Sequence, residues 1–170
     1  VSILEIGFGT GLNAFITFLE FPKFNQKINY VGIEAYPVTL EEAGLMNYVS
    51  ELNAENERFI FEKLHQCDWE EPLVINDDFM FTKRKQFFAD IGDVEQFDLI
   101  YFDAFGYDIQ PELWTAPIFK KMYEALKNKG VLVTYAARGI IKRNMIEAGF
   151  TVEKLVGAPG KREMFRARKG

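Results

Sequence analysis

The sequence has one cysteine and one histidine among its 170 residues. A lone thiol, Cys67, cannot form a disulfide within the chain, and Cys67 with His65 falls short of a zinc-ligand set. No apolar run approaches the ~20 residues of a membrane span, and no basic segment precedes an apolar leader. We therefore expect a domain that binds no metal, lies in the cytoplasm and does not enter a membrane.

Apolar material is plentiful by contrast, with 48% hydrophobic residues and 17 phenylalanines. This amount suffices for one hydrophobic core, and 170 residues fit one domain, so we expect a single domain over residues 1–170. The first apolar strand begins almost at residue 1, where folds of this kind usually place a preceding helix or cap. The sequence therefore predicts a domain that lacks an N-terminal extension.

The most informative segment is residues 3–11, an apolar strand that runs into Gly7, Gly9 and Gly11. Glycine allows a tight turn and close approach to a ligand, and a helix beginning just after it aims free N–H groups at that ligand. A dinucleotide fingerprint would place its third glycine where Leu12 stands. The spacing instead resembles the first motif of S-adenosylmethionine-dependent methyltransferases; a dinucleotide site or a purely structural turn are the alternatives.

Strand and helix patterns alternate along the chain, which predicts an α/β fold with a mostly parallel sheet covered on both faces. Strands are expected from residue 3 and over 28–33, 73–75, 79–88, 97–102, 131–135, 150–155 and 164–167. Helices are expected over 12–21, 40–52, 111–126 and 140–148, and Gly130 is the expected C-cap of the third. The segment that follows the second helix, up to residue 69, is expected to be irregular. The last two strands are joined by residues 157–160 without a helix, so they must pair antiparallel. One reversed strand should lie near an edge of this Rossmann-like sheet.

Carboxylates follow several of these strands, at the edge where ligands bind in such sheets. Glu34 is placed to accept hydrogen bonds from both ribose hydroxyls of a nucleoside, and Asp90 from an adenine amino group, unless Asp90 is only a helix N-cap. Glu5 is expected to tie down the glycine loop through backbone N–H groups and to approach the charged end of the cofactor. Acids suit the cationic sulfonium of S-adenosylmethionine. The predicted cofactor-binding residues are Glu5, Gly7, Phe8, Gly9, Thr10, Gly11, Asn13, Glu34, Asp90 and Asp103.

The chemistry is expected at residues 103–106, at the end of the most apolar strand. Methyl transfer needs a neutral nucleophile aimed at the methyl group, so it depends mostly on orientation. Asp103 can accept an N–H bond and steer an amine, and Phe105 can stack on a flat base or cover a positive centre. These two are the predicted catalytic residues; the alternative is that Asp103 only caps the next turn.

Charge is distributed unevenly. Residues 138–170 contain nine basic and three acidic side chains, whereas the first 137 residues contain eleven basic and twenty-two acidic ones. The basic side chains of residues 138–170 can bind the phosphate backbone of a nucleic acid. An equal alternative is that they are only the solvent-exposed side chains of a helix and a hairpin. The candidate nucleic-acid contacts are Arg138, Lys142, Arg143, Lys161 and Arg162.

Several longer segments carry a more specific resemblance: residues 5–13 (EIGFGTGLN), 101–105 (YFDAF), 110–115 (QPELWT), Arg143 with 148–150 (AGF), and 160–164 (GKREM). Together they resemble the tRNA 5-methylaminomethyl-2-thiouridine methyltransferase family, in its MnmC domain or stand-alone MnmD form. The resemblance implies methyl transfer from S-adenosylmethionine to the exocyclic amine of 5-aminomethyl-2-thiouridine at the wobble position, with the tRNA anticodon stem-loop as partner. It also implies that Asp103 lies beside the target amine.

One expectation qualifies this resemblance. Bifunctional relatives carry a flavin oxidase domain, and no second glycine-rich strand is present, so a flavin step must belong to another chain. The competing functions are an aminopropyltransferase-like or other small-amine methyltransferase of the same fold, a nucleotide-linked oxidoreductase, and a binding module without catalysis. Phe105, Tyr107 and Trp114 are candidate stacking platforms, although the helical spacing of Trp114 favours a core position.

Overall fold

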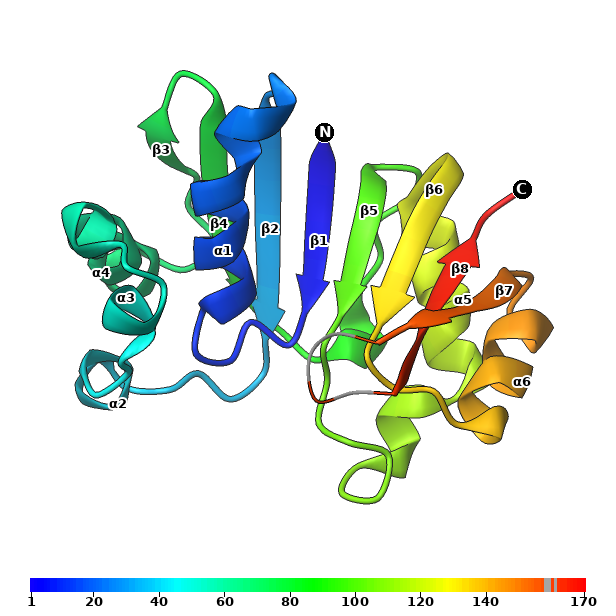
Figure 1. The fold of residues 1–170 in the computed structure, drawn as a ribbon. Coiled ribbons are helices and arrows are strands. Elements are labelled where there is room, and N and C mark those ends of the chain that lie inside the picture. Colours follow the sequence, from blue (N-terminus) through cyan, green and yellow to red (C-terminus); the bar gives the residue numbers. More distant parts are fainter. Residues whose placement is uncertain (158–159, 161) are drawn as a thin grey trace.

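The computed structural model describes residues 1–157, 160 and 162–170. Within them, an eight-stranded sheet has the order β3-β4-β2-β1-β5-β6-β8-β7 (Figure 1). Strands β4, β2, β1, β5 and β6 are parallel, whereas β3 and β8 each run antiparallel to a neighbour. The strands are β1 (Ser2–Ile6), β2 (Ile28–Glu34), β3 (Leu73–Asn76), β4 (Phe79–Lys85), β5 (Phe97–Phe102), β6 (Leu126–Thr134), β7 (Thr151–Val156) and β8 (Glu163–Arg168). The mostly parallel sheet with a reversed strand near one edge is confirmed.

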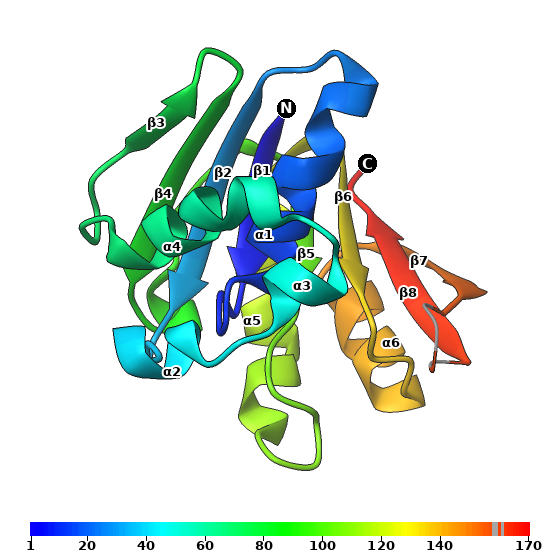
Figure 2. The same cartoon turned by 60° about the vertical axis from the view of Figure 1, so that its left-hand side comes forward.

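Helices cover both faces of the sheet. On one face lie α1 (Leu12–Glu20), α2 (Leu40–Gly44), α3 (Tyr48–Glu51) and α4 (Arg58–Gln66), and on the other lie α5 (Ala116–Ala125) and α6 (Gly139–Glu147) (Figure 2). Four short 3-10 turns, Phe21–Phe24, Glu55–Glu57, Phe88–Asp90 and Pro111–Trp114, link these elements. No helix in the described ranges has the length and apolarity needed to cross a membrane.

Two buried clusters, one on each face, hold the layers together. Phe15, Phe61 and Phe79 belong to the cluster under α1 and α4, while Phe102 and Trp114 belong to the cluster under α5 and α6. The alternation along β1 explains this division, because successive side chains of a strand point to opposite faces. One consequence concerns Glu5, since its place in the alternation with Ile3 puts a carboxyl on a buried face.

Two predictions for the segment between β2 and β3 are wrong. The helix expected over 40–52 is two short helices, α2 and α3, separated by residues 45–47. Gly44 ends the first of these, which fits its low helix propensity. The segment expected to be irregular contains α4, whose buried Ile60, Phe61 and Leu64 have the i, i+1, i+4 spacing of an amphipathic helix.

Three other element boundaries differ from the predictions. The strand expected over 79–88 ends earlier, because β4 stops at Lys85, which pairs with Glu34 at the end of β2. Residues 88–90 form a 3-10 turn instead. The helix expected from residue 111 is a 3-10 turn followed by α5, which starts afresh with Pro117 in its first turn, where proline is tolerated. Gly130 is no C-cap: it lies within β6, and a Cβ there would be 2.8 Å from the carbonyl oxygen of Lys127.

Candidate active site

The glycine loop between β1 and α1 crosses the carboxyl ends of β2 and β5. Gly7, Gly9 and Gly11 all have positive φ (88°, 51° and 76°). The backbone N–H groups of Gly7 and Phe8 donate to the carbonyl oxygen of Ile33 at 3.0 and 2.9 Å. A Cβ on Gly7 would lie 2.7 Å from the carbonyl oxygen of Asp103. The first glycine is therefore required by both its conformation and its contact with the end of β5.

Side chains from distant elements hold the loop. Glu34 accepts from the N–H of Gly9 at 2.9 Å through Oε2. The Thr10 hydroxyl is 2.8 Å from the hydroxyl of Tyr48, and Nε2 of His65 is 3.2 Å from the Thr10 carbonyl oxygen. The roles of Tyr48 and His65 were missed from the sequence; the apolar spacing of α4 is the signal that could have placed His65 near the core.

Glu5 has surroundings different from those predicted. Its carboxyl group is fully buried and accepts from the Tyr30 hydroxyl at 2.8 Å and from Nδ2 of Asn13 at 2.9 Å. The prediction that Glu5 ties down the loop through backbone N–H groups is wrong, because Glu34 accepts the Gly9 N–H instead. Burial is the main reason that the pKa of Glu5 is raised to about 8, against the lowering effect of its two hydrogen bonds.

Asn13 joins two carboxylates. Its Nδ2 also donates to Oδ2 of Asp103, at 2.8 Å, so one amide nitrogen bridges Glu5 and Asp103. Asp103 is exposed at the end of β5, and its own N–H donates to the carbonyl oxygen of Ile6 at 2.9 Å. The structure thus brings Glu5, Asn13 and Asp103 together, as the sequence predicted for residues of one site.

A cavity of about 840 Å³ opens over these groups. Its acidic side chains are Glu5, Glu34, Asp103 and Glu112, and within the described part of the chain no lysine, arginine or histidine lines it. The lining residues are Glu5, Gly7, Phe8, Gly9, Thr10, Leu12, Asn13, Glu34, Ala35, Tyr36, Val38, Tyr48, Phe87, Phe88, Ala89, Asp103, Ala104, Phe105, Gly106, Gln110, Glu112, Leu113, Ile118 and Tyr135. Such a cavity favours a cationic ligand with apolar surface and disfavours a pyrophosphate.

The loop after β5 forms one wall of this cavity. Phe105 is exposed and lines it, while the buried indole of Trp114 donates through Nε1 to the Phe105 carbonyl oxygen at 2.8 Å. The core position of Trp114 is therefore confirmed, and the residue also braces the loop from below. Asp90 is exposed and not among the lining residues, although its neighbours Phe88 and Ala89 are.

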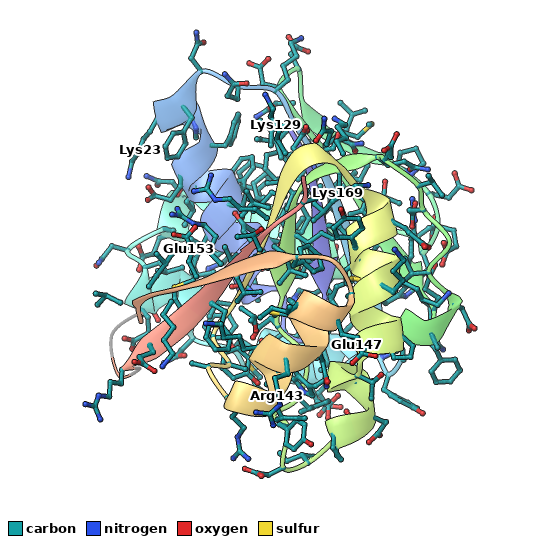
Figure 3. The ribbon with its side chains drawn as sticks, turned by 90° about the vertical axis from the view of Figure 1, so that its right-hand side faces the viewer. Lys23, Lys129, Arg143, Glu147, Glu153 and Lys169 are labelled. Carbon is teal, nitrogen blue, oxygen red and sulfur yellow. The ribbon has the colours of Figure 1, made fainter. Side chains whose placement is uncertain are left out.

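The basic residues of the last third do not form one patch. Lys154, Arg166 and Arg168 pair with Glu163 and Glu153 within the β7–β8 hairpin. Figure 3 shows Arg143 apart from Lys169 on one side of the molecule, with Glu147 and Glu153 on the same side, and Lys129 of β6 lies at the far end of this side from Arg143.

Of the predicted contacts, Arg138 pairs with Asp108 and lies 5.5 Å from the centre of the Tyr107 ring. Lys142 and Arg143, on α6, have no ion-pair partner within the ranges described. Arg162 is exposed beside β8, and Lys161 falls outside the described residues.

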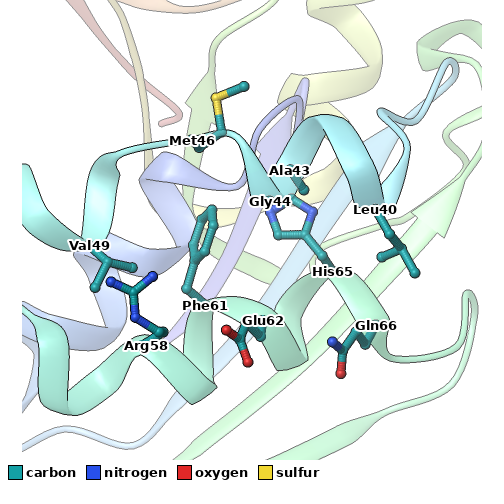
Figure 4. A pocket seen from close by; sticks show the side chains of 10 residues that line it. All are labelled: Leu40, Ala43, Gly44, Met46, Val49, Arg58, Phe61, Glu62, His65 and Gln66. Carbon is teal, nitrogen blue, oxygen red and sulfur yellow. The ribbon is translucent and has the colours of Figure 1, made fainter.

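A second cavity, of about 230 Å³, lies behind the loop between α2, α3 and α4 (Figure 4). His65 lines this cavity together with Phe61 and Val49, and its Nε2 contacts the Thr10 carbonyl oxygen. No group of three or more His, Cys, Asp or Glu side chains that could hold a metal ion is found in residues 1–157, 160 and 162–170.

Comparison with known proteins agrees with this geometry. A family model described as S-adenosyl-L-methionine-dependent methyltransferase matches residues 56–170. The chain belongs to this family, and its cofactor is S-adenosylmethionine.

Within this class, the chain resembles the methyltransferase part of MnmC proteins. It is 27% identical to the tRNA 5-methylaminomethyl-2-thiouridine biosynthesis bifunctional protein MnmC of Campylobacter fetus subsp. fetus (strain 82-40), across 98% of this chain and 28% of that protein. The crystal structure of MnmC2 from Aquifex aeolicus has a TM-score of 0.72 at 22% identity, across 98% of this chain and 52% of that one. The family resemblance drawn from the sequence is thereby confirmed.

A spermidine synthase structure has the same fold, with a TM-score of 0.55 at 15% identity, across 99% of this chain and 53% of that one. The chain spans about a quarter of the curated relative and about half of each of these two structures.

Proposed function

We propose that the chain transfers a methyl group from S-adenosylmethionine to the exocyclic amine of 5-aminomethyl-2-thiouridine at the wobble position of tRNA. The carboxylate-lined cavity, with Asp103 at its rim, carries this proposal. It supports a cationic donor and an amine acceptor in adjacent positions, and the similarity to MnmC supports the choice of tRNA as the acceptor. The proposed location of the protein is the cytoplasm, where its tRNA substrate is found.

The residues present fit the cofactor. Because Gly7 has no Cβ, the glycine loop packs directly against the backbone of Asp103, and Gly7 and Asp103 line the same cavity. We assign the ribose hydroxyls to Glu34, which keeps acceptor capacity beyond its bonds to the N–H groups of Gly9 and Tyr36. The adenine lies in this proposal beside Phe88 and Ala89, with its amino group toward Asp90. When bound, the cofactor supplies an activated methyl group on a positively charged sulfur.

Asp103 positions the acceptor. One of its oxygens accepts from Asn13, so the carboxylate is held in one orientation and its remaining acceptor capacity can receive an N–H of the incoming amine. An N–H bond to this carboxylate directs the nitrogen lone pair toward the methyl group, and such orientation is the main source of acceleration in this reaction. Phe105 covers the reacting centre with an aromatic face.

In this proposal the anticodon stem-loop contacts the basic residues that follow β6 in the sequence. Arg138 is connected through Asp108 and Tyr107 to the loop that ends in the cavity wall, and Lys142 and Arg143 follow on α6. Arg162, exposed beside β8, and Lys161, which precedes it in the sequence, complete the proposed set. Their function is to neutralise phosphates, whereas the wobble base is recognised in the site.

A second candidate is a transferase acting on a small polyamine, because a carboxylate-lined cavity also suits a polycation and the fold is shared with a spermidine synthase. Incubation of the protein with methyl-labelled S-adenosylmethionine and either undermodified tRNA or spermidine distinguishes the two. We expect label in the tRNA alone. Label in the polyamine alone would replace the proposal by the alternative.

Two substitutions test the assigned roles. We expect Asp103→Ala to reduce kcat at least 100-fold while the Kd for S-adenosylmethionine changes less than about fivefold, since Asp103 acts on the acceptor. Glu34→Ala should raise that Kd at least tenfold with a smaller effect on kcat. Calorimetric titration with single-turnover kinetics measures both quantities, and a reversed pattern would exchange the two roles.

A further inference from the structure

The proposed function gives no role to Glu112, the fourth acid that lines the large cavity. Glu112 lies in the 3-10 turn Pro111–Trp114 and is exposed. The carboxylates of Glu5, Glu34 and Asp103 each accept at least one hydrogen bond from another residue of the chain. Within the described ranges, the Glu112 carboxylate has no hydrogen-bond or ion-pair partner, and only its backbone oxygen accepts a hydrogen bond, from a threonine hydroxyl at 3.2 Å.

Two hydrogen bonds tie the turn that carries Glu112 to the loop after β5. On one flank, the N–H of Gln110 donates to the carbonyl oxygen of Gly106 at 3.1 Å. On the other flank, the indole of Trp114 donates to the Phe105 carbonyl oxygen at 2.8 Å. Glu112 is therefore held at the part of the cavity that begins at the end of β5, where the acceptor is proposed to bind.

Neighbouring cations do not neutralise Glu112. In the adjoining loop Arg138 pairs with Asp108. On α5, Lys121 donates to a backbone carbonyl oxygen at 3.2 Å, and Lys120 lies 5.0 Å from the centre of a tyrosine ring. In the part of the chain that the structure describes, none of these cations and no cation of α6 forms an ion pair with Glu112. A cationic group of a ligand in the cavity can therefore pair with it.

Methylation of an amine requires a proton acceptor. An alkyl amine such as that of lysine has a pKa of about 10.4, so at neutral pH it is mostly an ammonium, which has no lone pair for attack. Because no lysine, arginine or histidine of the described residues lines the cavity, the carboxylates are its candidate bases. Asp103 must stay ionised to hold an N–H of the amine, Glu5 is fully buried, and Glu34 holds the glycine loop. Glu112 remains.

We propose that Glu112 is a further catalytic residue, which accepts a proton from the ammonium form of the acceptor. This inference rests on the proposed function and supplies the step that prepares the nucleophile. The proton passes from nitrogen to a carboxylate oxygen of Glu112, and rotation about the C–N bond turns the freed lone pair toward the methyl group. The lone pair forms the N–C bond while the C–S bond breaks and its electron pair goes to sulfur. Glu112 releases its proton to solvent, and the methylated ammonium then loses its extra proton by the same route.

The test compares pH profiles. Glu112→Gln keeps the size of the side chain and removes the base. Glu55→Gln is the matched control, because Glu55 is also exposed in a 3-10 turn and lines neither cavity described above. For each protein, kcat/KM for undermodified tRNA is measured from pH 6 to 9 with saturating S-adenosylmethionine. Calorimetry gives the Kd for the cofactor, and thermal denaturation checks folding.

At pH 7 we expect Glu112→Gln to lower kcat/KM at least tenfold, with the cofactor Kd within threefold of wild type. This deficit should shrink at least tenfold between pH 7 and pH 9, because a growing share of the acceptor is already neutral and needs no base. Glu55→Gln should follow the wild type at every pH. If Glu112→Gln does not fold, Glu112→Ala takes its place and should give the same profile.

Three results would overturn the assignment while leaving the proposed function intact. A deficit that does not change with pH would mean a structural role, and a folded Glu112→Gln as active as Glu55→Gln would mean no role. Rescue of Asp103→Asn by high pH, without rescue of Glu112→Gln, would assign the proton to Asp103. Failure of the proposed function looks different, because the wild-type protein would then bind S-adenosylmethionine and leave tRNA unlabelled at every pH.

Discussion

At the scale of single residues, Glu5 is the most unusual group in the molecule. It is a fully buried carboxyl whose neighbours are a hydroxyl, an amide and, through Asn13, another carboxylate, with no cationic side chain lining the cavity above it in the part of the chain described. Burial disfavours the ionised form, which is why the pKa of Glu5 is raised. Tyr30, also fully buried, has its pKa raised chiefly by burial and further by Glu5.

This shift predicts a pH dependence of stability. The pKa of Glu5 is about 8 in the folded state against 4.5 unfolded, so between these values the folded state keeps a proton that the unfolded state has lost. Stability should therefore fall as the pH rises through this window, by up to about 1.4 kcal/mol per pH unit. Glu5→Gln removes this titration. Urea unfolding at pH 5, 6.5 and 8 should show the wild type losing stability relative to the variant, and parallel curves would contradict the assignment.

Asn13 offers a second residue-scale prediction. Because its Nδ2 donates to Asp103, we expect Asn13→Ala to lower kcat at least tenfold by releasing that carboxylate from its orientation. In an Asp103→Ala background the same change should have less than a twofold effect, since the group on which Asn13 acts is gone. Single-turnover rates of the four proteins close the cycle. Asn128→Ala, an exposed position on β6, serves as the control. Additive losses would mean that Asn13 acts independently of Asp103.

At the scale of elements, the crossing of the glycine loop over β5 predicts unequal sensitivity among glycines. Gly7→Ala must adopt φ 88° and place its Cβ 2.7 Å from a backbone carbonyl oxygen, so we expect a loss of at least ~2 kcal/mol in unfolding free energy and a displaced Asp103. Gly44→Ala has no atom within 4 Å of its Cβ and lies in α2, so it should be neutral or slightly stabilising. Urea denaturation and cofactor titration of both variants measure the contrast.

The elements also show what the sequence could reveal. The glycine loop, the parallel strands and the acids at their ends were predictable because each depends on residues adjacent in the chain. The braces by Tyr48 and His65, and the bridge by Asn13 to Asp103, join positions 38, 55 and 90 residues apart, and no local pattern encodes them. The loop contact that was predicted for Glu5 is made by Glu34, and this too was not predictable from neighbouring residues. Which acid meets the loop depends on the registers of β1 and β2, not on either strand alone.

At the scale of the whole molecule, the separation of the basic residues predicts that only those near Arg143 bind tRNA. Arg143 lies near the proposed binding side, whereas Lys129 lies at the opposite end of the same face (Figure 3). We expect Arg143→Gln to weaken tRNA binding and to lower the salt dependence of the affinity by about one phosphate contact, a change in slope of about 0.9. Lys129→Gln should leave both unchanged. Fluorescence anisotropy at several salt concentrations checks this, and equal effects of the two substitutions would indicate diffuse electrostatic attraction.

The buried acid under the glycine loop has a consequence for turnover. A positively charged donor arriving above Glu5 favours its ionised form, so near neutral pH the protein should expel a proton as it loads. Once the charge on sulfur is gone, the same carboxyl reclaims a proton and the spent donor has lost its counterion. We therefore expect S-adenosylmethionine to bind with uptake of less than its full positive charge, because Glu5 gives up a proton, and we expect the uncharged product to bind more weakly than the donor.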